Sequence, residues 1–396
     1  MYLTREEEGM LSGKEGPVVA KCMKLLVRLG EIYGADRMVK IGSSQAAGVS
    51  YKSIGEPGLE FLRGFAKEGA RVRVPTFLNP AGMDLRNWKN FGISEKFAKK
   101  QKDIIDAFKE MDVITTCSCT PYLSGNLPRY GEHLAWSESS AVAFANSVIG
   151  ARTNREGGPS ALAAAVTGRT SNYGLHLEDN RKPDFLIKVE TGLKDGDFGA
   201  LGYLVGKTLK NGVPYFSGIG DCTTDDLKGL GAAMAASGAI ALYHVENKTP
   251  EAKSYRDETK NLERIEFSVE DLKRSYDELS DCDAPNLITI GCPHASVSEI
   301  GFLTRKLEGK KLKKDLWVFT SRAAKVWADE MGYTKIIEES GAKMIFDTCM
   351  VVSPLEELDF ECIGTNSGKA AKYLPGFCKK KVFFADIDTL IEKGLK

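Results

Sequence analysis

Short apolar runs rich in β-branched residues alternate with helical stretches along almost the whole chain of 396 residues. The runs predicted as strands are RMVKIG, RVRVPTF, VITT, DFLIKVE, VPYFSGIG, AIALYHVE, NLITIG, DLWVFT and KMIFDT. Helical patterns such as LEFLRGFAKEG and LKGLGAAMAAS lie between most of them. This order is typical of α/β folds, in which helices cover both faces of a parallel sheet. The sequence therefore predicts three-layer α/β/α units with mostly parallel sheets.

The chain is long enough for two or three domains with a large core. A polar stretch at 246–268 is the best candidate for a boundary. We therefore expect an α/β core of two lobes over residues 1–268 and a C-terminal α/β/α domain over 269–396. Two other polar stretches, 43–58 and 121–137, are predicted to be long loops.

Composition excludes several classes of protein. The 54 basic and 54 acidic side chains balance, which gives no reason to expect nucleic acid or an anionic membrane as a partner. No apolar run reaches the roughly 20 residues of a membrane span, and the acidic start MYLTREEEGML is not a secretory signal. We expect a cytoplasmic protein, where free thiols persist and structural disulfides are rare. Five of the nine cysteines are then expected to include inert buried thiols: Cys22, Cys222, Cys282, Cys362 and Cys378.

Cysteines also stand at the ends of three predicted strands. Cys292 follows NLITIG, Cys349 follows KMIFDT, and the pair Cys117 and Cys119 follows VITT. Strand ends form the usual mouth of an α/β active site. The spacing is too wide for a zinc finger, but the thiols could converge in the fold as ligands of an iron–sulfur cluster. Packing of inert thiols in the core is the alternative. His294 lies two residues after Cys292, which favours a functional role for this segment.

Two polar loops could bind anions. Arg152 and Arg155 lie in a glycine-containing loop and suit bidentate recognition of carboxylate or phosphate, although a solvated surface loop is an equally good interpretation. Residues 365–369 follow a strand and open a possible helix, so that backbone amides, Ser367 and Lys369 could form an anion site. An ordinary capped helix start is the alternative there.

Several of these stretches together resemble the aconitase X family, specifically the large subunit of its archaeal two-subunit form. The resemblance covers essentially the whole chain. It is carried by TCSCTPYLSGN (116–126), YGEHLAWSESSAVAFAN (130–146), GARTNREGGPS (150–160), GRTSNYG (168–174), GCPH (291–294) and TNSGKAAKYL (365–374).

The resemblance implies a hydro-lyase with an aconitase-like core and an iron–sulfur cluster held by three cysteines, expected to be 4Fe–4S with one labile iron. Members of the family dehydrate either cis-3-hydroxy-L-proline or 5-phosphomevalonate. Aconitases carry a fourth, swivelling domain, for which a chain of this length has no room. A small partner subunit is then expected to supply the swivel domain. Within the family, the two-subunit form favours a phosphorylated hydroxy acid, (R)-5-phosphomevalonate, as the substrate. The expected reaction converts it to trans-anhydromevalonate 5-phosphate in an archaeal mevalonate pathway.

Site residues are assigned as expectations from the type of each residue and its position in a loop or at a strand end. Cys119, Cys292 and Cys349 are expected to bind the cluster, with Cys117 as the replacement for Cys119. His294 and Glu138 are the catalytic candidates. The expected substrate-binding residues are Ser44, Gln45, Glu138, Ser139, Arg152, Thr153, Asn154, Arg155, Ser367 and Lys369. Two other classes stay open: a non-catalytic iron–sulfur sensing protein, and a cofactor-free α/β enzyme with buried structural thiols.

Overall fold

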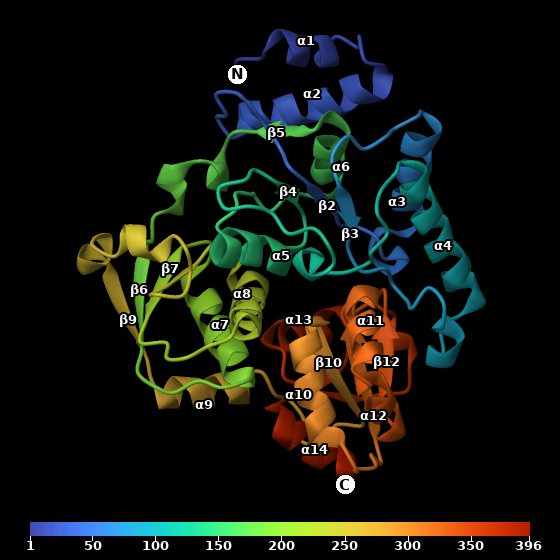
Figure 1. Cartoon of the computed structure of the whole chain (residues 1–396), viewed down its shortest axis with the longest axis vertical. Coiled ribbons are helices and arrows are strands. Elements are labelled where there is room, and N and C mark those ends of the chain that lie inside the picture. The colour runs from blue at the N-terminus through green and yellow to red at the C-terminus, as the bar shows by residue number, and fades with distance from the viewer.

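The computed structural model describes residues 1–396, which form three lobes, each built around a parallel sheet (Figure 1). The chain passes through them in order. Figure 1 shows the first lobe in blue to green, the second in green to yellow and the third in orange to red. The predicted mixed α/β fold with mostly parallel sheets is confirmed. No helix of the chain is long and apolar enough to cross a membrane.

The first lobe centres on a small parallel sheet in the order β3-β2-β4. Its strands are β2 (Ser44–Ala46), β3 (Thr76–Leu78) and β4 (Ala135–Trp136), and an antiparallel pair joins β1 (Met38–Lys40) to β5 (Arg169–Ser171). The surrounding helices are α1 (Arg5–Leu11), α2 (Pro17–Ile32), α3 (Tyr51–Lys67), α4 (Glu95–Glu110), α5 (Ser139–Phe144) and α6 (Gly158–Thr167). A core cluster of 28 buried residues joins this sheet to the helices packed on it.

The second lobe holds four parallel strands in the order β8-β7-β6-β9. These are β6 (Phe185–Val189), β7 (Pro214–Ser217), β8 (His244–Val245) and β9 (Glu263–Phe267), with α7 (Gly196–Leu209), α8 (Thr224–Gly238) and α9 (Val269–Glu278). Helices α7 and α8 pack closely because Gly202 faces the backbone of α8. A Cβ at Gly202 would lie 2.5 Å from the carbonyl oxygen of Leu230. The boundary predicted at 268/269 falls between β9 and α9.

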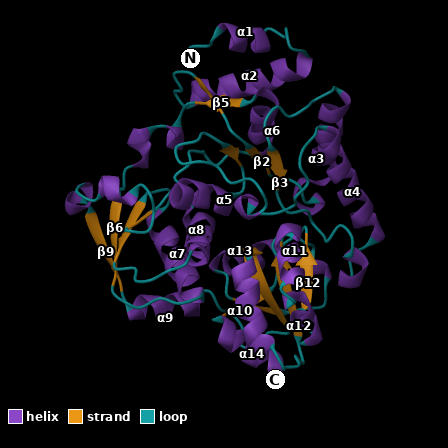
Figure 2. Cartoon of the chain, in the orientation of Figure 1, coloured by secondary structure: helices purple, strands orange, loops and turns teal.

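The third lobe is a five-stranded parallel sheet in the order β12-β11-β10-β13-β14. Figure 2 shows its strands enclosed by helices. The strands are β10 (Leu287–Ala295), β11 (Asp315–Thr320), β12 (Lys343–Phe346), β13 (Cys362–Thr365) and β14 (Lys381–Phe384). One face packs on α10 (Val297–Leu307), α11 (Arg322–Glu330), α12 (Tyr333–Glu339) and α14 (Ile387–Leu395), the other on α13 (Gly368–Cys378). Two separate core clusters on the two faces make this lobe three-layered.

Strand order creates a crevice in two of these sheets. In the third lobe the chain builds one side of the sheet from β10 through β12 and then returns to place β13 on the other side of β10. In the first lobe β3 and β4 likewise lie on opposite sides of β2. Ligands of open α/β sheets bind outside the carboxyl ends of strands at such reversals. The ends of β2, β4, β10 and β13 are therefore where a site is expected.

Some local predictions were wrong. The predicted loop at 43–58 contains β2 and the start of α3, and the polar stretch 246–268 contains β9. In both places the polar composition indicated irregular structure where the chain forms a strand. The side chains of Ser44 and Gln45 in β2 are fully buried with their polar atoms hydrogen-bonded, whereas β9 is an edge strand with its polar residues facing water. The run VITT forms only an isolated bridge between Ile114 and Phe77.

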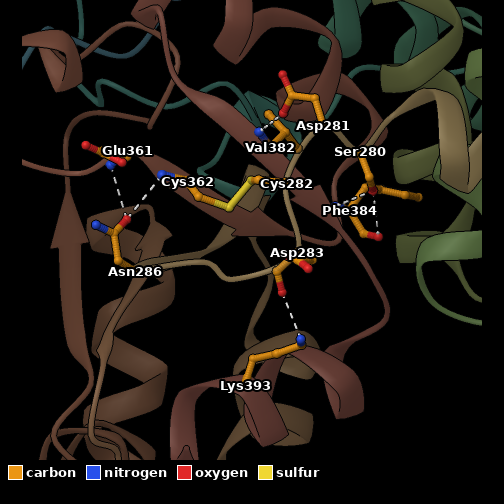
Figure 3. Close-up of a disulfide and its surroundings, with 10 residues drawn as sticks. All are labelled: Ser280, Asp281, Cys282, Asp283, Asn286, Glu361, Cys362, Val382, Phe384 and Lys393. Carbon is orange, nitrogen blue, oxygen red and sulfur yellow. Dashed lines mark hydrogen bonds between the residues drawn. A yellow bond between two sulfur atoms is a disulfide. The ribbon is translucent and has the colours of Figure 1, made fainter.

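A disulfide joins Cys282 to Cys362, contrary to the expectation of free thiols (Figure 3). It fastens the segment that enters the third lobe to β13. The side-chain oxygen of Asn286 accepts hydrogen bonds from the amides of Glu361 and Cys362, and Asp281 accepts one from the amide of Val382. The two cysteines are 80 residues apart, and nothing in their local sequence indicates that the fold brings them together.

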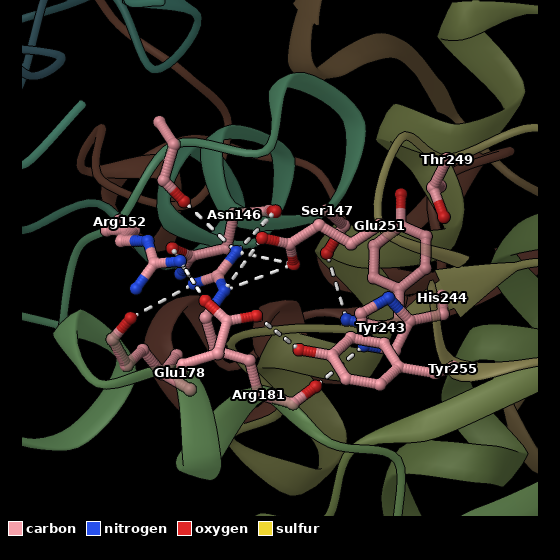
Figure 4. Close-up of polar contacts among 12 residues, drawn as sticks. Asn146, Ser147, Arg152, Glu178, Arg181, Tyr243, His244, Thr249, Glu251 and Tyr255 are labelled. Carbon is pink, nitrogen blue, oxygen red and sulfur yellow. Dashed lines mark hydrogen bonds and ion pairs between the residues drawn. The ribbon is translucent and has the colours of Figure 1, made fainter. Parts of the chain in front are cut away.

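A buried arginine links the first and second lobes (Figure 4). The side chain of Arg181 is fully buried and forms an ion pair with Glu251 at 2.8 Å. It also donates to the side chain of Asn146 and to the carbonyl oxygens of Asn146, Ala151 and Leu175. These contacts satisfy the guanidinium and hold the loop at 145–152 against the second lobe.

Candidate active site

Five segments that follow strands bring chemically active side chains to one place between the first and third lobes. In the first lobe, β4 leads to Glu138, and the bridge at Ile114 leads to Cys119. In the third, β10 carries Cys292, β12 leads to Cys349, and β13 leads to the first turn of α13. The two lobes touch there, because the amide of His294 donates to the sulfur of Cys119 at 3.2 Å.

A buried ion pair joins the two lobes at this point. The ammonium of Lys369 on α13 contacts the carboxylate of Glu138, which caps α5, and also contacts the hydroxyl of Ser140. Both ionised side chains are less than a tenth exposed. Burial opposes both charges, but Lys369 holds the pKa of Glu138 below its usual value, and Glu138 raises the pKa of Lys369. The pair is therefore charged at neutral pH.

The three predicted cluster ligands converge beside this pair. The thiols of Cys292 and Cys349 both act on the pKa of Cys119, so the three sulfur groups lie within electrostatic reach of one another. Burial raises the pKa of each thiol, while the ammonium of Lys369 lowers it. All three are less than a tenth exposed. Positive charge next to buried thiols favours their thiolate forms, which are the forms that bind metal.

One of these sulfurs accepts a hydrogen bond across the lobes, from the amide of His294 to Cys119. At Cys292 the hydroxyl of Ser367 donates to the backbone carbonyl oxygen and so ties the start of α13 to the cysteine's segment. Hydrogen bonds to sulfur are one means by which proteins tune iron–sulfur clusters. No group of three or more His, Cys, Asp or Glu side chains is arranged around a single ion. Thiolates from three separate segments are a donor set that could hold an iron–sulfur cluster.

Cys117 has different surroundings. It is fully buried in the core of the first lobe, and its nearest charged groups are Asp347, Arg322 and Lys109 rather than the other thiols. Its left-handed backbone, with φ of 47°, turns the chain between the two cysteines of the pair. Cys117 and Cys119 therefore do not share one environment.

His294 lies at the centre of the contact between the lobes and is fully buried. Its Nδ1 is hydrogen-bonded to the hydroxyl of Ser118 at 3.1 Å, and its Nε2 donates to the carbonyl oxygen of Thr348 at 2.7 Å. Burial lowers its pKa to about 4, so the ring is neutral. Both ring nitrogens are in use, and this is the geometry of a group that positions the segments carrying Cys119 and Cys349.

Several predicted substrate-binding residues have their polar atoms fully engaged within the protein. The hydroxyl of Ser44 lies within hydrogen-bond distance of two carbonyl oxygens, and Gln45 bridges the carbonyl oxygen of Ser118 and the amide of Glu138. Thr153 and Asn154 hydrogen-bond to neighbouring backbone groups, and the hydroxyl of Ser139 donates to Glu138. These residues shape the loops around the site.

The two loop arginines differ. Arg152 forms an ion pair with Glu178, as Figure 4 shows. It also donates to the carbonyl oxygen of His176. Arg155 is exposed and forms no ion pair. Only Arg155 is therefore free to meet an anion without breaking an existing contact.

A cavity of about 540 Å³ opens between the second and third lobes, next to Cys292 and Ser367. The first turns of α8, α10 and α13 line it. Acidic side chains outnumber the basic ones in its lining, but most of them are engaged: Asp225 and Glu299 hold the buried Lys228, and Asp226 and Asp386 cap helices. The cavity gives a small molecule a route to Cys292.

Sequence reasoning missed Ser118, Ser140 and Lys228, which contact the residues described above. Two of them lie within stretches that carry the family resemblance, but their residue types alone gave no reason to single them out. The sequence did not single out Lys228. It pairs with Asp225 three residues earlier, but Glu299 lies 71 residues later and comes close only in the fold.

Nearly the whole chain matches the domain models of one known protein family. Residues 1–179 match the aconitase X first domain, 183–277 the second domain and 285–396 the third domain. The chain belongs to the aconitase X family. The crystal structure of Thermococcus kodakaraensis aconitase X in its holo-form superimposes on the whole chain with a TM-score of 0.93 and 49% sequence identity, each chain being covered completely.

Curated aconitase X relatives carry two activities. The phosphomevalonate dehydratase large subunit of Methanocaldococcus jannaschii is 56% identical over 99% of this chain and all of its own length. The cis-3-hydroxy-L-proline dehydratase of Pseudomonas aeruginosa is 31% identical over 98% of this chain, which covers 69% of that longer protein. Both relatives are dehydratases, and this chain is a hydro-lyase.

Proposed function

We propose that the chain is the large subunit of an enzyme that dehydrates (R)-5-phosphomevalonate to trans-anhydromevalonate 5-phosphate in an archaeal mevalonate pathway. The observation that carries this proposal is the full-length similarity, at 56% identity, to a phosphomevalonate dehydratase large subunit, against 31% for a hydroxyproline enzyme. The convergence of three buried thiols on the Glu138–Lys369 pair supports it.

We assign Cys119, Cys292 and Cys349 as ligands of an iron–sulfur cluster, expected to be 4Fe–4S with one labile iron. When bound, a cluster with three protein ligands supplies a Lewis-acidic iron that accepts the leaving hydroxyl of the substrate. The surroundings support the assignment, because all three thiols are buried and the ammonium of Lys369 lowers the pKa of each. Cys117 lacks the neighbouring thiols and is the poorer candidate.

The protein's own groups bind and orient the substrate in this proposal. Dehydration removes a proton from the carbon beside the carboxylate, and a cation near that carboxylate stabilises the charge that develops. Arg155 is the free arginine for this role. The amides of Gly368 and Lys369 at the start of α13 are suited to the phosphate, because the first amides of a helix have no partner within it. Glu138 keeps Lys369 charged and in place beside them.

We further propose that a small subunit carrying a swivel domain completes the site. The archaeal relatives of the same extent are named large subunits, and the longer hydroxyproline enzymes contain this chain's equivalent within one polypeptide. The base that removes the proton is then expected to come from the small subunit, because Glu138 is paired with Lys369 and both ring nitrogens of His294 are hydrogen-bonded.

Anaerobic turnover with both subunits tests this function. The reconstituted large subunit, with and without its small partner, is supplied with 5-phosphomevalonate or with cis-3-hydroxy-L-proline, and loss of water is followed by mass spectrometry. We expect 5-phosphomevalonate to react and the proline not to, with activity only when both subunits are present. Faster conversion of the proline would disprove the substrate assignment. Full turnover by the large subunit alone would disprove the requirement for a small partner subunit.

A further inference from the structure

A lysine of the second lobe is buried against the segment that carries Cys292 and His294. Lys228 lies in the first half of α8, and its side chain is only 2% exposed. Its ammonium forms ion pairs with Asp225 of the same helix, at 2.8 Å, and with Glu299 in the first turn of α10 in the third lobe. Burial opposes the charge of Lys228, but Glu299 and Asp225 together raise its pKa. Lys228 is therefore a charged contact between the second and third lobes.

The same groups hold the turn that joins β10 to α10. The ammonium of Lys228 donates to the carbonyl oxygen of His294 at 3.4 Å. The hydroxyl of Ser296 donates to Asp225 at 2.6 Å, and the amide of Ser296 donates to Glu299 at 2.8 Å. These three hydrogen bonds fix the backbone that directly follows a predicted cluster ligand.

The turn held by Lys228 also contacts the segments of the other two thiols. The amide of His294 donates to the sulfur of Cys119, and its Nε2 donates to the carbonyl oxygen of Thr348, the residue before Cys349. The carbonyl oxygen of the same histidine is the one that Lys228 contacts. The second lobe therefore acts on all three thiol segments, although none of the three thiols belongs to it.

These contacts lie at the wall of the cavity beside Cys292. Asp225, Lys228 and Glu299 line that cavity together with the cysteine. A small reagent that enters the cavity can reach Cys292, which is 8% exposed. The reactivity of this thiol then reports how firmly its segment is held.

We propose that Lys228 is a positioning residue, which holds the segment of Cys292 and His294 in the arrangement that lets the three thiols bind one cluster. This inference rests on the proposed function for the identity of the cluster. In this role Lys228 acts through the backbone of His294 and through Glu299 rather than by binding the substrate. Groups outside the ligand set commonly fix the orientation of ligands, and their loss weakens metal binding about tenfold to hundredfold.

Lys228→Met tests this role with two measurements, because it removes the ammonium and keeps most of the length of the side chain. In the anaerobically reconstituted protein, iron should be released to a chelator about tenfold to hundredfold faster than in the wild type. In the protein without iron, alkylation of Cys292 by iodoacetamide, followed by peptide mass spectrometry, should be several-fold faster. The second measurement depends neither on a cluster nor on activity.

Arg169→Met is the matched control. Arg169 forms a 3.0 Å ion pair with Glu7, and both side chains are less than a tenth exposed. Breaking this buried pair should lower the thermal midpoint about as much as Lys228→Met does. Iron release and alkylation of Cys292 should stay as in the wild type, because the partners of Arg169 belong to α1 and the end of α6.

Two milder variants separate position from unpaired charge. Lys228→Arg keeps a cation between the two carboxylates, so it should restore most of the slow iron release. Glu299→Gln leaves Lys228 paired with Asp225 but removes the ion pair to the third lobe. It should therefore speed iron release and alkylation by a smaller factor than Lys228→Met.

Unchanged iron release and unchanged alkylation of Cys292 in Lys228→Met would overturn the inference. Equal changes in Arg169→Met would overturn it too, because they would show a general effect of lost stability. If Lys228→Met does not fold, Glu299→Gln decides by the same two measurements. If the wild type binds no iron, the proposed cluster fails, and the alkylation of Cys292 then decides whether Lys228 holds this segment.

Discussion

Alanine at Cys119, Cys292 or Cys349 is expected to abolish both iron binding and dehydration. All three thiols are buried within electrostatic reach of Lys369, and a cluster held by three thiolates has no spare protein ligand. Each variant is reconstituted anaerobically, and its iron content, visible absorbance and turnover are compared with those of the wild type. The expected result is background iron and no measurable turnover in all three.

Cys117→Ala is the matched control for this series. Cys117 is as buried as Cys119 and only two residues away, but it lies among different neighbours. It should keep its iron and its turnover while losing a little stability. Normal iron in Cys119→Ala together with loss of iron in Cys117→Ala would reverse the assignment of the ligand.

Removing Lys369 is expected to give the largest loss of stability at the site. Lys369→Met leaves the buried carboxylate of Glu138 without its partner, which typically costs about 3–5 kcal/mol of unfolding free energy. The loss should be smaller at acidic pH. An unpaired, buried Glu138 has a pKa above its usual 4.5, so lowering the pH protonates the carboxyl and relieves the penalty.

Denaturant unfolding at several pH values measures this effect. The matched control is Lys21→Met, which removes an ion pair of about the same length with Glu68, both side chains being roughly half exposed. Surface pairs contribute little, so this control should cost less than about 1 kcal/mol at every pH. A penalty for Lys369→Met that is equally small, or that grows as the pH falls, would show that the Glu138–Lys369 pair is not ionised in the folded protein.

Much of the fold followed from the sequence, because strand and helix periodicities are local. The strands β10, β11 and β12 of the third lobe match predicted runs, since a parallel sheet buried on both faces needs continuous apolar residues. The strand β2 was missed for the opposite reason. Its side chains Ser44 and Gln45 are polar, and their burial depends on hydrogen bonds to segments about 70 to 120 residues away.

The site was predictable in part for the same reason. Cysteines at strand ends pointed to a common place, because the carboxyl ends of parallel strands meet at one edge of a sheet. Roles that depend on partners could not be predicted. Lys369 was expected to meet a phosphate, but its ammonium contacts Glu138, which lies 231 residues earlier in the chain. The disulfide between Cys282 and Cys362 is another pairing that only the fold creates.

We propose that the first and third lobes together hold an iron–sulfur cluster beside Glu138 and Lys369. An anomalous difference map, recorded at the iron edge from crystals of the anaerobically reconstituted protein, tests it most directly. Iron peaks are expected in contact with the sulfurs of Cys119, Cys292 and Cys349, and none at Cys117. Iron bound elsewhere, or iron held by cysteines of one lobe only, would contradict it.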